Sequence, residues 1–351
     1  MPQSTPYDAL LLLSFGGPEG MDEVMPFLEN VLRGRNVPPA RMMEVAHHYE
    51  QFNGVSPINA QNRALIAALE TELAAHNIEL PIYFGNRNWH PLLTDTMQQM
   101  VDDGVQRVLT FFTSIYSSYS GCRQYRENLY GAAQSLTRGQ APHFDKIRMA
   151  YNHPLFIEAN ADRIQDALAQ IPPARRNAAQ LVFTAHSIPI AMAQNCQYVE
   201  QLMETGRLVA EVVKHPHWQL VYQSRSGPPT VPWLEPDICD HLQALHEQGI
   251  QDVVIAPIGF ISDHMEVIFD LDTEARQLCD ALGLNMVRAA TVGTHPAFVQ
   301  MLRELVEERI NPNAERRAMG RLPASHDLCP ADCCLSGRPG PAQPALAQRA
   351  P

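Results

Sequence analysis

The feature that most constrains the fold is a regular alternation between short apolar runs and longer amphipathic stretches. Short runs rich in β-branched and aromatic residues predict buried strands, and apolar positions at helical spacing predict the helices between them. The predicted strands are Ala9–Leu13, Ile82–Gly85, Val108–Phe112, Ile147–Tyr151, Leu181–Ala185, Leu220–Gln223, Val253–Pro257 and Met286–Arg288. The clearest predicted helices are Asn59–His76, Leu92–Asp103, Gln124–Ser135 and Ala297–Arg309. This pattern predicts an α/β protein with two similar doubly wound, Rossmann-like domains, each built on a parallel sheet of four strands.

The domain boundaries follow from length and from the same pattern. A chain of 351 residues is longer than one typical core requires and suits two domains. We expect an N-terminal domain over residues 1–153, a C-terminal domain over 154–294, and a last helix within 295–318 that packs back on the first domain. Residues 319–337 form a cysteine-bearing extension, and residues 338–351, rich in Pro and Ala, are expected to be disordered.

Composition argues against several classes of function. The 26 Lys and Arg residues are outnumbered by 38 Asp and Glu residues, and the net charge of -12 repels nucleic acids and anionic lipid surfaces. The apolar run Ala9–Phe15 is much shorter than the ~20 residues that span a bilayer, and it lacks the flanks of a signal peptide. We therefore expect a cytoplasmic protein without a transmembrane segment or a nucleic-acid partner. We also expect a monomer, although no sequence feature bears on oligomeric state directly.

One histidine and three carboxylates are the strongest candidates for chemistry, because ligands of open α/β sheets bind beyond the carboxyl ends of the strands. His186 directly follows the strand LVFTA. Glu266, Asp270 and Glu274 are spaced by four residues and would line one face of a helix. An isolated His is often a core or capping residue, and an acidic helix face is often only solvated. Imidazole with carboxylate is also a ligand set suited to Fe(II) and similar metals, so the pattern supports either interpretation.

Two loops could form a pocket for a large flat ligand. The segments Phe112–Tyr125 and Gln223–Trp233 combine aromatic side chains with Ser and Gly, which suits such a pocket. Turns with core aromatics would explain either segment taken alone. Four further residues that could contact an anionic ligand are Arg33, Arg35, Tyr49 and Ser56. Surface arginines usually have no such role.

Eight motifs in this order resemble those of the ferrochelatase family, over nearly all of residues 7–310. They are LLLSFGGPEG, FLENVLRGR, NGVSPIN, YFGNRNWHP, SSYSGCRQY, FTAHSIP, YQSRSGPPTVPWLEPD and PIGFISDHMEVIFDLD. The resemblance implies a chelatase-like fold and a lyase that inserts Fe(II) into a porphyrin in haem biosynthesis. The chain looks most like soluble bacterial members of the family, which implies coproporphyrin III as the porphyrin and Fe-coproporphyrin III as the product.

The resemblance also implies roles for individual residues. His186 and Glu266 would bind the incoming iron and handle the pyrrole protons, and Asp270 and Glu274 would extend the acidic row for metal or proton traffic. The expected porphyrin contacts are Phe15, Arg33, Arg35, Tyr49, Ser56 and Tyr125. Relatives of this branch often carry Tyr after the first strand as a possible axial ligand to the product iron. This chain has Phe15 there, which puts axial ligation from that side in question.

The cysteines suggest a second metal centre. Three of the seven, Cys329, Cys333 and Cys334, lie in the segment HDLCPADCCLSG. Such clustering in a chain without a secretory signal favours metal or redox chemistry over disulfides. Some ferrochelatases carry a [2Fe–2S] cluster with one ligand far upstream, and by this resemblance Cys196 would be the fourth thiolate. Zinc held by four thiolates is the alternative.

Three other functions fit parts of the pattern. The first is iron insertion into protoporphyrin IX, and the second is cobalt or nickel insertion into a sirohydrochlorin-type ring. The third is a chaperone or sensor that binds haem or metal without catalysis. The long set of ordered motifs argues against the sirohydrochlorin reading.

Overall fold

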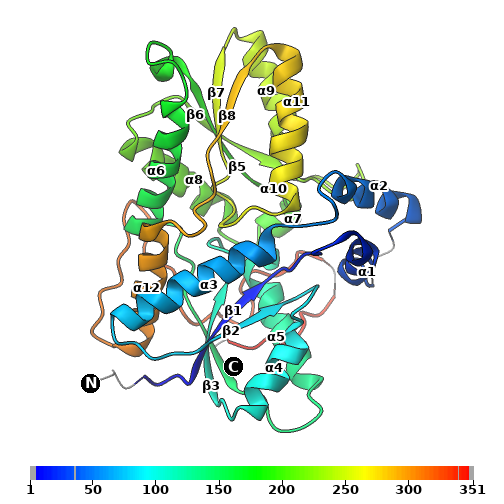
Figure 1. Ribbon diagram of the computed structural model, residues 1–351, viewed down its shortest axis with the longest axis vertical. Helices are drawn as coiled ribbons and strands as arrows, with labels where there is room; N and C mark the ends of the chain where they lie inside the picture. Colours follow the sequence, from blue (N-terminus) through cyan, green and yellow to red (C-terminus); the bar gives the residue numbers. More distant parts are fainter. Residues whose placement is uncertain (1–4, 35–36, 339, 348–351) are drawn as a thin grey trace.

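The computed structural model describes residues 5–34, 37–338 and 340–347 and contains two parallel four-stranded sheets, one above the other in Figure 1. In the first sheet the order is β2-β1-β3-β4, and the strands are β1 (Ala9–Ser14), β2 (Ile82–Asn86), β3 (Arg107–Phe112) and β4 (His143–Lys146). In the second the order is β6-β5-β7-β8, and the strands are β5 (Gln180–His186), β6 (Trp218–Gln223), β7 (Asp252–Ala256) and β8 (Asn285–Arg288). All neighbouring strands pair in parallel, which confirms the predicted fold class.

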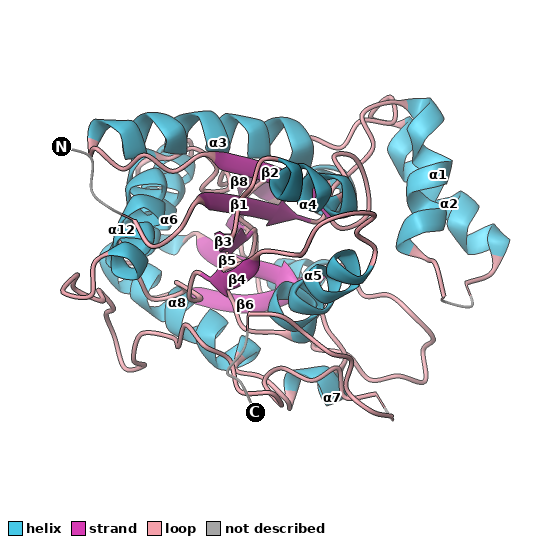
Figure 2. Ribbon diagram, turned by 90° about the horizontal axis from the view of Figure 1, so that it is seen from below, coloured by secondary structure: helices cyan, strands magenta, loops and turns pink. Residues whose placement is uncertain are grey.

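Helices lie outside the strands in both halves (Figure 2). Those of the first half are α1 (Met21–Val31), α2 (Pro39–Glu50), α3 (Ile58–Ala75), α4 (Leu93–Asp102), the π-helical turn η1 (Tyr119–Arg123) and α5 (Gln124–Gln134). Those that follow are α6 (Pro154–Ala169), the short turn η2 (Arg176–Ala178), α7 (Ile190–Ala193), α8 (Tyr198–Val212), α9 (Ile238–Glu247), α10 (Met265–Phe269), the π-helical turn η3 (Asp270–Ala275), α11 (Arg276–Leu282) and α12 (Pro296–Ile310). No helix in the described part of the chain is long and apolar enough to cross a membrane.

The fourth strand of the first sheet is not where the sequence predicted it. The prediction was Ile147–Tyr151, but β4 is His143–Lys146 and ends where that apolar run begins. The run is buried because it leaves the sheet and enters the core shared by the two halves, where Tyr151 is 3% exposed. Hydrophobicity therefore marked a buried connection rather than a strand. The true strand carries polar side chains that have specific partners, described below.

The two halves are joined by a continuous core and by hydrogen bonds. The Tyr116 hydroxyl donates to the Ile258 carbonyl oxygen at 3.0 Å, and Gln201 accepts from the Ser117 backbone N–H at 2.8 Å. The sequence predicted that the last helix packs on the first domain, and α12 contacts both α3 and α6. These contacts fix the position of one sheet relative to the other. A site formed between the two sheets requires such a fixed arrangement.

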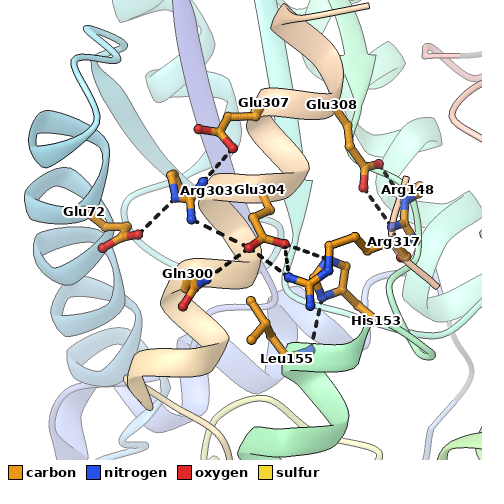
Figure 3. Close-up of polar contacts among 10 residues, drawn as sticks. All are labelled: Glu72, Arg148, His153, Leu155, Gln300, Arg303, Glu304, Glu307, Glu308 and Arg317. Atoms are coloured by element: carbon orange, nitrogen blue, oxygen red, sulfur yellow. Dashed lines mark hydrogen bonds and ion pairs between the residues drawn. The ribbon is translucent and has the colours of Figure 1, made fainter. Parts of the chain in front are cut away.

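Ion pairs anchor α12 to its neighbours (Figure 3). Arg303 joins Glu72 of α3 at 3.0 Å, and Glu304 accepts from Arg317 of the following segment at 2.8 Å. Glu304 also lies 3.3 Å from Nε2 of His153, which is fully buried. Burial and the nearby positive charges of Arg148 and Arg317 lower the pKa of His153 to about 3, so this imidazole is neutral at physiological pH.

A helical hairpin from the first half lies over the second half. Helices α1 and α2 pack through a separate apolar cluster against α10. The buried members of this cluster are Val24, Phe27, Leu28, Ala46, Tyr49, Met265 and Phe269. The imidazole of His48 also stacks on Phe269, with ring centroids 3.7 Å apart. This hairpin places Tyr49 close to the start of α10.

The segment after α12 runs back along the first half. The Asn152 side chain donates to the Leu322 carbonyl oxygen at 2.7 Å, and Arg126 donates to that of Leu346 at 3.1 Å. The sequence predicted disorder from residue 338. In the described stretch 340–347, however, Ala345 and Ala347 are buried, at 6% and 8% exposure. Contacts with basic side chains of the core hold this low-complexity stretch in place.

Candidate functional site

The carboxyl edge of the second sheet positions the first candidate site. His186 is the last residue of β5 and lies beside Gln223, the last residue of β6. The Gln223 side chain donates to the Glu266 carbonyl oxygen at 2.7 Å, which fixes the first turn of α10 to the end of the strand. The Tyr198 hydroxyl donates to the His186 carbonyl oxygen at 3.0 Å. Strand ends and a helix start are therefore tied together at this point, as expected for a ligand site of an open parallel sheet.

His186 and Glu266 form an ion pair. Nε2 of His186 lies 3.4 Å from Oε1 of Glu266, while its Nδ1 contacts the Ser187 carbonyl oxygen. Burial lowers the pKa of His186, but the charge and hydrogen bond of Glu266 outweigh burial and raise that pKa to about 9. For Glu266, burial raises the pKa and His186 lowers it, with a result of about 2. The pair is thus charged at neutral pH.

A second histidine shares the same carboxylate. Nδ1 of His264 lies 3.6 Å from Oε2 of Glu266, and the imidazole is edge-on to Phe260. Burial lowers the pKa of His264, so near neutral pH it offers an uncharged nitrogen beside Glu266. His264 was not among the predicted site residues, although it lies within the motif PIGFISDHMEVIFDLD. An imidazole two residues before a candidate carboxylate was the signal that could have found it.

The row of carboxylates lies on a continuous helical segment formed by α10, η3 and α11. The π-helical turn begins at Asp270, and such turns occur frequently at functional sites. Burial raises the pKa of Asp270 to about 7, the Ser224 hydroxyl opposes this by donating a hydrogen bond, and the charges of Glu266 and Glu274 add to it. Glu274 itself is exposed. Because Glu266 and Glu274 both act on Asp270, the three carboxylates form one electrostatically coupled row. This row runs from the His186 pair to the exposed Glu274.

Two tyrosines of the first half lie within electrostatic reach of this site. Burial raises the pKa of Tyr49, and the charge of Glu266 raises it further. Burial also raises the pKa of Tyr125; the charge of the Arg87 guanidinium, which stacks on its ring at 4.7 Å, opposes this, and Glu266 again adds to it. These two tyrosines lie within electrostatic reach of the same carboxylate, so the site is formed between the two sheets.

Phe15 is an exposed aromatic residue of the first half. It follows β1, is 37% exposed, and lies edge-on to Phe27 with ring centroids 6.3 Å apart. The same Arg87 guanidinium lies 5.6 Å from its ring centroid. An exposed aromatic ring beside the buried Tyr125 offers an apolar surface to a flat ligand.

The remaining predicted porphyrin contacts are Ser56, Arg33 and Arg35. Ser56 is 4% exposed and donates its backbone N–H to Pro18. A Cβ atom at Gly17 would lie 2.7 Å from the Ser56 Cβ, so only glycine allows these loops to meet. Arg33 is exposed in the loop after α1, and Arg35 lies outside the described residues.

The tail thiols meet Cys122 rather than Cys196. Cys122, in η1, is hydrogen-bonded to Cys329, and the Sγ atoms of Cys333 and Cys334 are 3.5 Å apart. Cys196 instead contacts the carbonyl oxygens of Met192 and Ala193. Burial and then the nearby Cys334 raise the pKa of Cys196 to about 11. The structure thus brings Cys122, rather than Cys196, into contact with the tail thiols, and Cys196 as the fourth cluster thiolate stays a prediction.

The donor chemistry of this cluster fits a bound metal. Nε2 of His326 lies 3.8 Å from Sγ of Cys333, and ligand atoms of His326, Cys329 and Cys333 all lie within 4.8 Å of one another. The hydrogen bond between Cys122 and Cys329, together with burial, raises the pKa of Cys122, while the same bond lowers that of Cys329. Cys122 contacts Cys329 and Cys334 contacts Cys333, so the tightest group, of one imidazole and two thiols, has two further thiols beside it. This donor set suits an iron–sulfur cluster or a closed zinc site.

Comparison with known proteins identifies the family. The family model described as Ferrochelatase matches residues 7–310. The chain belongs to the ferrochelatase family. A ferrochelatase of Rhodopirellula baltica is 56% identical, with 95% of each chain covered. A coproporphyrin III ferrochelatase of Streptomyces coelicolor is 52% identical, with 97% of this chain and 96% of the other covered.

The family match confirms the predicted enzyme class, a porphyrin metal chelatase of the lyase class with Fe2+ as its metal substrate. A solved structure of SirB from Bacillus subtilis with Fe3+ shares the fold. Its TM-score is 0.54 at 15% identity, with 91% of this ferrochelatase chain and 99% of the other covered.

Proposed function

We propose that this ferrochelatase inserts Fe(II) into coproporphyrin III, with His186 and Glu266 as the residues that receive iron and protons. The observation that carries the proposal is the charged pair at 3.4 Å, which lies within electrostatic reach of Tyr49 and Tyr125 of the other half. Relatives named coproporphyrin III ferrochelatase, about half identical over nearly the whole chain, support the choice of porphyrin.

Iron insertion exchanges two protons of the porphyrin for the two positive charges of Fe2+. The porphyrin releases two N–H protons as Fe2+ enters, so the neutral macrocycle gives a neutral product and the enzyme takes up the protons. His186 is protonated at neutral pH, because its pKa is about 9, and it must lose that proton before Nε2 can bind iron. Incoming Fe2+ and the His186 proton therefore compete for one position beside the Glu266 carboxylate.

The acidic row can carry the released protons. Among Glu266, Asp270 and Glu274, Asp270 has a pKa of about 7 and so exchanges protons readily near neutral pH. Glu266 remains ionised because its pKa is about 2, and it can accept a proton only transiently. We infer a path to the exposed Glu274 that begins with transfer of the His186 proton to Asp270. His186 can then accept a pyrrole proton once iron has left its Nε2 for the macrocycle.

The porphyrin test is a competition experiment. The enzyme receives Fe(II) under anaerobic conditions with equal concentrations of coproporphyrin III and protoporphyrin IX, and the products are separated by chromatography. We expect Fe-coproporphyrin III to dominate. Preferential formation of haem would support protoporphyrin IX as the substrate. Stoichiometric binding of iron porphyrin without any insertion would support the function of a haem chaperone.

We also propose that the thiol site holds a [2Fe–2S] cluster through Cys122, Cys329, Cys333 and Cys334, with zinc as the alternative occupant. The contact of Cys122 with Cys329 and the proximity of the tail thiols support this. When bound, the cluster would supply one-electron redox chemistry and would crosslink the tail to η1. Anaerobically purified protein should be reddish-brown with equal iron and sulfide. A colourless protein with stoichiometric zinc would contradict the cluster. A cytoplasmic location and a monomeric state remain predictions.

A further inference from the structure

Lys146 is a buried cation placed beside the thiol site. The chain contains 24 Arg but only two Lys, Lys146 and Lys214. Lys146 ends β4 and is 1% exposed, and its Nζ donates to the His326 carbonyl oxygen at 3.0 Å. The imidazole of that same His326 approaches Sγ of Cys333. A single hydrogen bond thus ties the edge of the first sheet to the segment that carries the tail thiols.

The acidic neighbour of Lys146 faces the other way. Successive strand residues point to opposite faces, and Asp145 accepts from the Tyr7 hydroxyl at 2.9 Å on its own face. Asp145 also pairs with Arg107 and Arg309, at 3.4 and 3.7 Å. Among the residues that the structure describes, Lys146 makes no ion pair with a carboxylate. Its partner, a carbonyl oxygen, orients the ammonium but carries no charge that could neutralise it.

A buried ammonium without a counter-charge is strongly unfavourable. The hydrogen bond of Nζ to the His326 carbonyl oxygen holds the ammonium beside the group in which ligand atoms of His326, Cys329 and Cys333 lie within 4.8 Å of one another. The charge of Lys146 also favours the thiolate forms of Cys122, Cys329 and Cys334. Arg126, fully buried on α5, acts on Cys334 in the same direction. The thiol site is therefore built in a positive environment, which suits an anionic occupant held by thiolates.

We propose that Lys146 is a positioning residue for the thiol site: its fixed charge offsets the negative charge of a thiolate-bound iron cluster and so sets the reduction potential of that cluster. This inference rests on the iron–sulfur cluster proposed above. The cluster gains one negative charge when it accepts an electron, so a nearby fixed positive charge stabilises the reduced form more than the oxidised form. Removal of that charge must shift the midpoint potential to a more negative value.

The test is a redox titration of the purified holoprotein with dithionite, followed by visible and electron paramagnetic resonance spectra. Lys146→Met removes the charge with little change in side-chain length, and Lys146→Arg retains it. Lys214→Met is the matched control, because Lys214 is the only other lysine and is exposed. We expect a negative shift for Lys146→Met only, with the Lys146→Arg and Lys214→Met potentials close to that of the wild type.

Thermal unfolding separates this role from a purely structural one. In the full chain with iron, Lys146→Met should lower the unfolding temperature, whereas in the iron-free chain it should leave it unchanged or raise it, because an uncompensated charge is removed. Equal destabilisation of both forms would overturn the proposal, as would an unchanged potential in an iron-loaded Lys146→Met variant. If Lys146→Met does not fold, Lys146→Arg provides the test. A Lys146→Arg variant that folds but binds no iron would refute the role of charge. A Lys146→Arg variant that binds iron with the wild-type potential would support it. A wild-type protein that holds zinc instead would refute the cluster itself, and this inference with it.

Discussion

The ion pair of His186 and Glu266 gives a prediction that can be measured on a single imidazole. In the wild type the pKa of His186 is about 9, against an ordinary value of 6.5, because the Glu266 charge outweighs the effect of burial. Glu266→Gln removes that charge and keeps the shape, so that burial is opposed only by the Ser187 carbonyl oxygen and the charge of Asp270. We therefore expect the pKa of His186 to fall from about 9 toward its ordinary value of 6.5 in the variant. A pKa of 6.5 would raise the neutral imidazole at pH 7.5 from roughly 3% to roughly 90% of molecules.

The assay is a pH titration of the histidine signals by two-dimensional NMR, with His186→Ala used to assign the His186 resonance. The pair contributes little to folding, because 49% of the Glu266 side chain and 31% of the His186 side chain are exposed and solvent screens their attraction. Glu266→Gln should therefore cost about 1 kcal/mol of stability or less. A His186 pKa that is the same in wild type and variant would refute the reasoning.

The linkage between this pair and stability has a defined sign. The folded-state pKa of His186 lies above its ordinary value of 6.5. Its contribution is therefore fully present below pH 6.5 and is lost as the pH rises through about 9. Glu266 behaves in the opposite way: its contribution is present above its ordinary pKa of 4.5 and is lost as the pH falls toward about 2.

Three further predictions concern iron, protons and the thiol site. Because Fe2+ must displace the His186 proton, the apparent KM for Fe2+ in steady-state assays should fall by up to about tenfold per pH unit between pH 7 and 8.5; a KM independent of pH would contradict the competition. Asp270→Asn should remove the component of the kcat–pH profile near pH 7, and an unaltered profile would exclude Asp270 from the proton path. Cys122→Ser should lose the thiol-bound iron, measured as iron per chain, whereas Cys196→Ser should keep it; the reverse result would restore Cys196 as a ligand.

The sequence predicted the sheets because buried parallel strands read as continuous apolar runs, and all six residues of β1 are buried. It misplaced the fourth strand because β4 carries Asp145 and Lys146, whose partners, Tyr7 and His326, are distant in sequence. Local hydrophobicity could not distinguish this polar strand from the buried connection that follows it.

The candidate sites also contain residues that the sequence could predict and residues that it could not. His186 and Glu266 could be predicted because each follows a recognisable strand within a specific motif. The choice between Cys122 and Cys196 could not, because it depends on how the tail folds back across η1, and no local pattern encodes that path. The disorder predicted from residue 338 stays a prediction, and composition says nothing of the carbonyl contacts that Arg123 and Arg126 make with Gln343 and Leu346.

The central claim is that His186 and Glu266 perform the insertion itself. The most direct test is anaerobic insertion of Fe(II) into coproporphyrin III, followed by visible spectroscopy, for wild type, His186→Ala and Glu266→Gln, with porphyrin binding measured in parallel by fluorescence quenching. We predict that insertion falls by orders of magnitude in both variants while the porphyrin still binds. Turnover close to that of the wild type in both variants would contradict the account.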